Sequence, residues 1–131
     1  MENNFKLEII SPEKIIFSDY AEMVTLPSYE GDMSILKNHI PTINFLRPGI
    51  IKIQTDNEKL EEFFVEDGTV EYFNNILVVL SSSAINIKNI SKELIKSINK
   101  NTEEKLMEKN ITDHDRYVLN HKLAALKEIR S

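Results

Sequence analysis

The sequence is punctuated most strongly at Glu30-Gly31-Asp32-Met33-Ser34-Ile35-Leu36-Lys37-Asn38-His39-Ile40-Pro41. Together with Arg47-Pro48-Gly49, this stretch holds two of the three glycines, two of the four prolines and one of the three histidines. Glycine adopts backbone angles that other residues reach only with strain, and proline fixes φ and removes a donor. Such a cluster between apolar runs predicts a shaped, rigid loop, and loops on a rigid scaffold often carry binding sites.

Short apolar runs separated by turn residues lie on both sides of this loop. From Phe5 to Ile10 the residues alternate with the period of two that is typical of a half-buried strand. Further strands are expected at Ile15–Phe17, Glu22–Leu26, Met33–Leu36, Thr42–Leu46, Ile50–Gln54, Glu61–Glu66, Thr69–Phe73, Leu77–Ser81 and Ala84–Ile87. Turns are expected at Thr55-Asp56-Asn57, Asp67-Gly68 and Asn74-Asn75. This spacing predicts a β sandwich or flattened barrel of about ten short antiparallel strands.

The pattern changes to a helical one near residue 90. Ser91 is a good N-cap, and the apolar residues after it recur at helical spacing to about Lys109. A second apolar stripe follows Thr112 and Asp113 to the C-terminus, so an antiparallel two-helix hairpin is expected. We therefore predict an N-terminal β-sandwich domain over residues 1–88 and a C-terminal helical hairpin over residues 89–131. The narrow apolar stripes predict that the hairpin docks only lightly on the strands.

Charge and composition exclude several classes of function. The net charge of −5 disfavours nucleic-acid binding, and the absence of cysteine excludes disulfides and thiol chemistry. Residues 1–90 carry 7 basic and 14 acidic side chains, a net −7, whereas residues 91–131 carry 9 and 7, a net +2. No apolar run approaches the roughly 20 residues of a membrane-spanning helix, and the beginning of the chain does not resemble a signal peptide. We expect a soluble protein with no direct membrane insertion.

Catalytic and metal sites are weakly supported. Glu30, Asp32 and His39 could act as metal ligands or as an acid–base set, but no further histidine stands at chelating spacing. His114 and His121 are too far apart in the sequence to chelate one ion in the way that i and i+4 pairs do. The run from Ser81 to Ser83 lacks the flanking glycines of a nucleophile elbow, and phosphate-binding glycine motifs are missing. We expect no catalytic residue, no bound metal and no cofactor.

A series of motifs along the chain resembles the epsilon subunit of F-type ATP synthase, of the bacterial type. Each motif is weak alone, but their order and spacing are specific. They are Ile9-Ile10-Ser11-Pro12-Glu13, Phe17-Ser18, Glu30-Gly31-Asp32, Asn38-His39-Ile40-Pro41, Arg47-Pro48-Gly49-Ile50-Ile51-Lys52-Ile53, Phe64-Val65-Glu66-Asp67-Gly68-Thr69-Val70-Glu71, Val78-Val79-Leu80 and Ala84-Ile85. The expected helical hairpin also falls where that family has one.

The resemblance implies a non-catalytic subunit of the rotor's central stalk, which couples proton-driven ring rotation to ATP synthesis in the catalytic head. It implies that Glu30, Gly31 and Asp32 face the ring of c subunits. It also implies that His39, Pro41 and Thr42 contact the gamma subunit. The hairpin would inhibit ATP hydrolysis when extended toward the catalytic alpha and beta subunits. The basic residues that could meet their acidic surface are Lys92, Lys96, Lys100, Arg116, Lys122 and Lys127.

The sequence departs from the family at a few positions. Ser34 and Lys37-Asn38 replace residues that are commonly glycine and Pro-Gly, and Asp67 replaces the first residue of a common double glycine. Asparagine and aspartate tolerate left-handed backbone, so we expect the fold to be unaffected. The family's ATP-binding motif, Ile/Leu-Asp-x-x-Arg-Ala, corresponds here to Ile90-Ser91-Lys92-Glu93-Leu94-Ile95. The aspartate and arginine are missing, so no ATP binding through this motif is expected.

Two other readings remain open from the residues alone. One is a free-standing β-sandwich module that binds a peptide or carbohydrate, and the other is a small jelly-roll enzyme with a metal at Glu30, Asp32 and His39. Neither explains the run of matching motifs. If the resemblance holds, the protein is expected as a peripheral subunit on the cytoplasmic face of the bacterial inner membrane.

Overall fold

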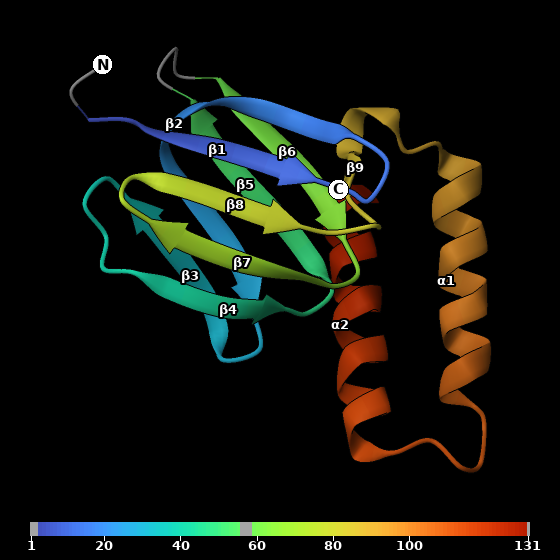
Figure 1. Ribbon diagram of the computed structural model, residues 1–131. Coiled ribbons are helices and arrows are strands. Elements are labelled where there is room, and N and C mark those ends of the chain that lie inside the picture. The colour runs from blue at the N-terminus through green and yellow to red at the C-terminus, as the bar shows by residue number, and fades with distance from the viewer. Residues whose placement is uncertain (1–2, 56–58, 131) are drawn as a thin grey trace.

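The structure is a computed structural model that describes residues 3–55 and 59–130. In these residues the chain forms nine strands, a 3₁₀ helix and two α-helices (Figure 1). The strands are β1 (Phe5–Ile10), β2 (Ile15–Ser28), β3 (Gly31–Leu36), β4 (Thr42–Leu46), β5 (Gly49–Thr55), β6 (Leu60–Val65), β7 (Gly68–Phe73), β8 (Ile76–Leu80) and β9 (Ile85–Asn86). The helices are η1 (Ile87–Asn89), α1 (Lys92–Leu106) and α2 (Asp113–Arg130). The predicted fold class is confirmed.

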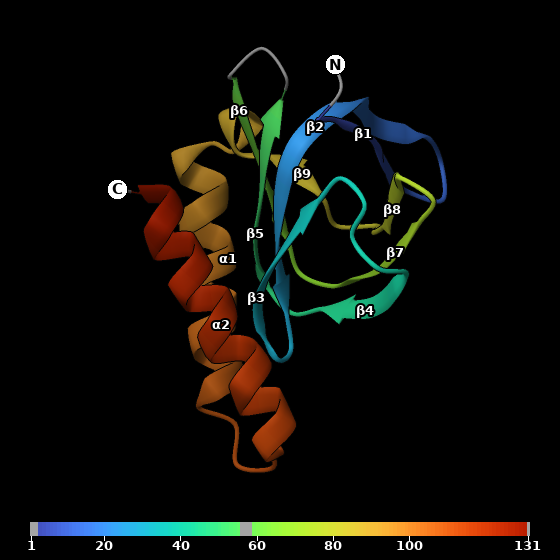
Figure 2. The same ribbon diagram turned by 90° about the vertical axis from the view of Figure 1, so that its left-hand side faces the viewer.

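The strands form one sheet that folds over into two layers. The hydrogen-bonded order is β1-β8-β7-β4-β2-β5-β6-β9, with β3 paired to β2 and a further β1–β2 pairing that closes the sheet. Figure 2 shows β5 on the side of the helices and β7, β8 and β4 on the opposite side. Apolar side chains from both layers fill the space between them. The largest of these that are fully buried are Phe5, Leu7, Ile9, Leu26, Ile35, Leu46, Ile51, Ile53, Tyr72 and Leu77.

Strand β2 connects the two layers. Its first half pairs with β1 and its second half with β5 and β3, and Ala21 pairs with both Phe5 and Thr55. The sequence predicts two separate strands here, at Ile15–Phe17 and Glu22–Leu26, and that division is wrong. The polar segment between them remains in the ladder because its partner β1 continues alongside it, as the pairing of Asp19 with Leu7 shows.

The stretch from Glu30 to Pro41 is two turns with a strand between them, and not a single loop. Strand β3 pairs with β2 from Gly31, opposite Ser28, to Leu36, opposite Met23. The alternation of Met33 and Ile35 with polar neighbours favours a strand, and Ile35 is fully buried. The strand expected at Met33–Leu36 is therefore present, and it begins two residues earlier.

One strand pair departs from the expected antiparallel pattern. β1 and β8 pair in parallel, from Lys6 opposite Ile76 to Ile10 opposite Leu80. Turn residues set the direction of strands that follow one another in the sequence, but β1 and β8 are separated by most of the sandwich. Their relative direction follows from closure of the sheet, which no local signal in the sequence reports.

The tight turns use residues that tolerate left-handed backbone. Asn74 and Asn75, with φ of 53° and 62°, form the predicted two-residue hairpin between β7 and β8. Asn38 also has a positive φ, 65°, at the position where the family commonly has glycine. Its backbone N–H donates to Asn75 Oδ1 at 2.8 Å, which joins these two turns. The turn expected at Thr55-Asp56-Asn57 falls partly outside the described residues.

The hairpin lies against the outer face of β5 and β6 (Figures 1 and 2). Ser91 caps α1, because its side chain accepts from the Leu94 N–H at 3.0 Å. The predicted first helix ends three residues early, at Leu106, and the second begins at Asp113. A second, smaller apolar cluster joins the helices to the sheet, and it consists of Ile50, Phe64, Ile95, Ala125 and Leu126. Docking is therefore limited in area, as the narrow apolar stripes predict.

Candidate functional site

An uncovered apolar surface lies on β4, β7 and β8, on the side of the sandwich away from the helices (Figure 2). Ile43 is 75%, Phe45 60% and Phe73 63% exposed. The strand register aligns these side chains across the sheet: Phe73 is opposite Ile76, and Phe45 and Leu80 both pair with Thr69. We call Ile43, Phe45, Phe73, Ile76 and Leu80 the apolar face. Exposed Glu71 lies among them, opposite Ile43. Exposed apolar side chains gathered on one face of a sheet mark interaction sites.

The residues with an implied gamma contact border the apolar face. His39 packs edge-on against Tyr72, with the ring centroids 5.7 Å apart, and its Nδ1 lies 3.3 Å from the Thr42 hydroxyl. Pro41 is exposed in the connection that leads into β4. Burial raises the pKa of Tyr72, while backbone hydrogen bonds from Asn38 and His39 act in the opposite direction. His39 is thus fixed by contacts within the chain.

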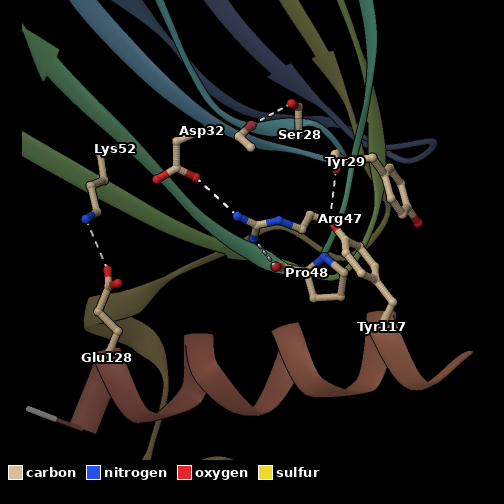
Figure 3. A network of polar contacts seen from close by, with 9 residues as sticks. Ser28, Tyr29, Asp32, Arg47, Pro48, Lys52, Tyr117 and Glu128 are labelled. Carbon is tan, nitrogen blue, oxygen red and sulfur yellow. Dashed lines mark hydrogen bonds and ion pairs between the residues drawn. The ribbon is translucent and has the colours of Figure 1, made fainter. Parts of the chain in front are cut away.

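The residues with an implied ring contact form the turn between β2 and β3. Glu30 is exposed in the turn, and Gly31 has a φ of 121°, which favours glycine. The Ser28 hydroxyl donates to the Gly31 carbonyl at 2.6 Å and closes the turn. Asp32 follows and pairs with Arg47 at 3.3 Å (Figure 3). The structure therefore brings Glu30, Gly31 and Asp32 to one rigid turn, whereas His39 lies at the other end of β3.

Arg47 lies between this turn and α2. One guanidinium nitrogen donates to Asp32, another donates to the Pro48 carbonyl at 2.9 Å, and Nε is buried without a partner (Figure 3). A cavity of about 160 Å³ separates the guanidinium region from α2. It is lined by Pro27, Asp32, Arg47, Gly49, Ile50, Lys52, His121, Ala124, Ala125 and Glu128. The sequence singles out Arg47 only within the motif that begins Arg47-Pro48-Gly49, and not as a neighbour of the second helix.

Aromatic side chains join α2 to the same turn. The Tyr117 hydroxyl donates to the Tyr29 carbonyl at 2.9 Å, and the two rings stack 5.8 Å apart (Figure 3). Tyr29 also stacks on His114, and the ring centroids of Tyr117 and His121 are 4.4 Å apart. Sequence reasoning missed this cluster, because nothing in the local pattern pairs Tyr29 with a helix far along the chain.

His121 has a perturbed pKa. Burial lowers the pKa of His121, the nearby Arg47 guanidinium lowers it further, and Asp32 acts in the opposite direction. Desolvation penalises the charged imidazolium, and a neighbouring cation does the same. The neutral ring is therefore the form that fits the closed hairpin.

The basic residues of the hairpin do not form one surface. Lys92, Lys96 and Lys100 are exposed on α1, and Arg116 and Lys127 are exposed on α2. Lys122 is different: its side chain is only 14% exposed and forms an ion pair with Glu66 at the end of β6. Lys52 and Glu128 form a second, more exposed ion pair between β5 and α2 at 3.2 Å (Figure 3). These two pairs join α2 to the sandwich.

The other motifs have structural roles. The Ser81 hydroxyl donates to the Asp67 carbonyl at 2.8 Å, and the Ser83 hydroxyl accepts from the Glu66 N–H at 2.9 Å. Among the described residues, no group of three or more His, Cys, Asp or Glu is placed to hold a metal ion. No helix in residues 3–55 and 59–130 is long and apolar enough to cross a membrane.

Comparison with known proteins gives consistent matches. Residues 4–87 match the family described as ATP synthase, Delta/Epsilon chain, beta-sandwich domain. An ATP synthase epsilon chain of Pelagibacter ubique is 44% identical, over 98% of this chain and 99% of the relative. An ATP synthase epsilon chain of Parvibaculum lavamentivorans is 30% identical, over 99% of this chain and 98% of the relative.

Two solved structures resemble the fold. A chain from the Euglena gracilis mitochondrial ATP synthase, solved as OSCP/F1/c-ring, superposes with a TM-score of 0.79 at 16% identity, over 98% of this chain and 82% of that one. A chain from the Tetrahymena thermophila mitochondrial ATP synthase central stalk and c-ring superposes with a TM-score of 0.61 at 14% identity, over 96% of each chain. At these identities the likeness shows the shared fold alone.

Proposed function

The chain belongs to the ATP synthase delta/epsilon chain family, and from this premise we propose that it is an epsilon-type subunit of the rotor's central stalk. In that role it is an accessory, non-catalytic subunit that couples proton-driven ring rotation to ATP synthesis. The observation that carries the proposal is the 44% identity to an ATP synthase epsilon chain over 98% of this chain. A match that continues through the hairpin favours a stalk subunit over a free-standing ligand-binding module.

The gamma subunit is the proposed partner of the apolar face. The hairpin leaves this surface uncovered, and burying it in a rotor interface would remove it from water. His39, Pro41 and Thr42 border it and would lie at the polar rim of the interface. The proposal therefore places the energy of binding in Ile43, Phe45 and their neighbours, and gives His39 a positioning role.

The turn between β2 and β3 is the proposed contact with the c-ring. Glu30 is exposed at its tip, and Asp32 offers a carboxylate whose side chain is 68% exposed although it pairs with Arg47. Charges at a rim of this kind set register and rate of association more than affinity. The turn is held by Ser28 and Gly31, so it would transmit torque without local unfolding.

The hairpin is the proposed regulatory element, with a division near residue 88 between sandwich and hairpin. The described state is the docked one, in which Lys122 pairs with Glu66 and Leu126 is buried against the sheet. Extension would free Lys122 and add it to the exposed Lys92, Lys96 and Lys100. These cations could then meet acidic surfaces of the alpha and beta subunits and inhibit ATP hydrolysis.

The proposed location is peripheral, on the cytoplasmic face of the bacterial inner membrane, held there by the rotor. Co-purification tests the function directly. Affinity-tagged chain, expressed in its own host and isolated in mild detergent, should carry the gamma, alpha, beta and c subunits with it. Recovery of the tagged chain without gamma and the catalytic subunits would contradict the proposal.

A further inference from the structure

Several contacts hold α2 on the sandwich. Near its beginning Tyr117 bonds to and stacks on Tyr29, and near its end Leu126 is buried against β5 and β6. Between them stands His121, half-buried above the cavity that contains the Arg47 guanidinium. Unlike tyrosine and leucine, histidine changes its charge near neutral pH.

Charged and titratable groups face His121 from every element packed around it. The Arg47 guanidinium is mostly buried, and one of its nitrogens has no partner, so it is poorly screened by water. The Asp32 carboxylate is already paired with Arg47 and is more exposed. On the sandwich, the groups near His121 are Asp32 on β3, Arg47 in the connection between β4 and β5, and Lys52 on β5. On α2 they are Tyr117 and Glu128. The adjacent Lys122 pairs with Glu66, in the connection after β6.

From this geometry we propose that His121 is a proton-sensitive latch, which holds α2 against the sandwich while its ring is neutral and releases α2 when the ring is protonated beside Arg47. The cavity offers the neutral ring a partly desolvated position against Tyr117. The carboxylates that line the cavity, Asp32 and Glu128, already pair with Arg47 and Lys52, so each is shared with another cation. Protonation therefore adds a cation to a site that already contains one.

The direction of the pH effect follows from the docked and undocked states. In the docked state the pKa of His121 is below its ordinary value. In the undocked state the ring is in water, and its pKa returns to the ordinary value of about 6.5. The undocked state thus binds the proton more tightly. Docking is strongest above about pH 6.5, and it weakens as the pH falls from there to the lowered pKa that His121 has in the docked state. The inference concerns the isolated chain, so its test does not depend on assembly with the rotor.

The test measures how far the hairpin opens as a function of pH. The chain contains no cysteine, so the exposed residues Gln54 on β5 and Asn110 between the helices can be replaced by spin-labelled cysteines. Double electron–electron resonance on the full chain then reports the populations of docked and undocked hairpin. From about pH 8 to about pH 5.5, we expect the docked-to-undocked ratio to fall about threefold to tenfold. A ratio that stays constant or rises would overturn the proposal.

Variants separate His121 from other titrating groups. His121→Gln keeps a neutral polar side chain and should remain docked at both pH values, whereas His121→Arg should be undocked at both. His114→Gln is the matched control on the same helix and should keep the wild-type response, since His114 is exposed and does not line the cavity that contains Arg47. An unchanged response in His121→Gln, or a lost one in His114→Gln, would contradict the latch.

A measurement on the wild-type chain covers the case in which a variant perturbs the fold. The ring protons of His121 can be titrated by NMR while the label distance is followed over the same pH range. The two transitions should coincide. A hairpin transition that occurs without titration of His121 would overturn the proposal.

Discussion

The Tyr117 hydroxyl donates to the Tyr29 carbonyl at 2.9 Å, and the two rings stack at a centroid distance of 5.8 Å. This contact joins α2 to the residue before Glu30, which is the first residue of the proposed ring contact. The hairpin and the turn that is proposed to face the ring are therefore in direct contact. A change at either one can reach the other through these two side chains.

Replacing Tyr117 by phenylalanine should weaken docking of the hairpin. The change removes one hydrogen bond, worth about 0.5–1.5 kcal/mol, and keeps the stacked ring. The docked-to-undocked ratio should fall by about twofold to tenfold in the resonance measurement with labels at Gln54 and Asn110. Tyr20→Phe, on an exposed tyrosine of β2, is the control and should leave the ratio unchanged. Equal effects of the two variants would remove the role given to Tyr117.

The two apolar clusters should unfold separately. Leu126→Ala creates a cavity in the cluster under α2, whereas Ile53→Ala creates one in the core of the sandwich. Each should cost about 2–5 kcal/mol. Native-state hydrogen exchange should show faster exchange in α1 and α2 for Leu126→Ala, with strand protection kept. Ile53→Ala should lower protection in the strands. Loss of strand protection in Leu126→Ala equal to that in Ile53→Ala would show a single cooperative unit.

A chain truncated after Lys88 should keep the sandwich and lose the inhibition. Among the described residues, Ala84 is the last member of the main core along the chain, so circular dichroism should show a cooperative thermal transition of β structure. Ile50 and Phe64, which the helices cover, become exposed, and lower solubility is expected. The truncated chain should still assemble with the gamma subunit, and ATP hydrolysis by the complex should rise. Failure to assemble would place binding determinants in the hairpin.

Exchange of Asp32 for lysine should impair coupling to the ring. The variant breaks the ion pair with Arg47 and reverses a charge on the turn that is proposed to face the ring. Proton-driven ATP synthesis in membrane vesicles should fall several-fold, while circular dichroism stays native. Asp19→Lys makes the same change in charge on an exposed part of β2, distant from the turn in sequence, and should have little effect. Normal synthesis in the Asp32 variant would remove the reason for placing the ring contact there.

Most strands could be predicted from the sequence because their signals are local. The alternation from Phe5 to Ile10 and the run from Thr42 to Leu46 predict β1 and β4 with the observed bounds. The Asn74-Asn75 turn and the Ser91 cap are also where the sequence places them. In each case the residues that decide the structure are neighbours in the chain.

Features set by distant contacts could not be predicted in this way. The continuity of β2 depends on β1 staying alongside its polar middle, and the parallel pairing of β1 with β8 depends on closure of the sheet. The sites at Tyr29 and Arg47 depend on where α2 docks, which no local pattern encodes. The resemblance to the family supplied Glu30 and Asp32 as candidates, but the contacts that hold them came only from the structure.

The most direct test of the central claim is the affinity of the chain for a catalytic complex that contains gamma and lacks its own epsilon subunit, measured by isothermal titration calorimetry. Saturable one-to-one binding is predicted, and Phe45→Glu in the apolar face should weaken it at least about tenfold. Leu60→Glu makes the same change at an exposed apolar residue of β6, outside that face, and should bind as the wild type does. No binding by the wild-type chain, or equal weakening by both variants, would contradict the account.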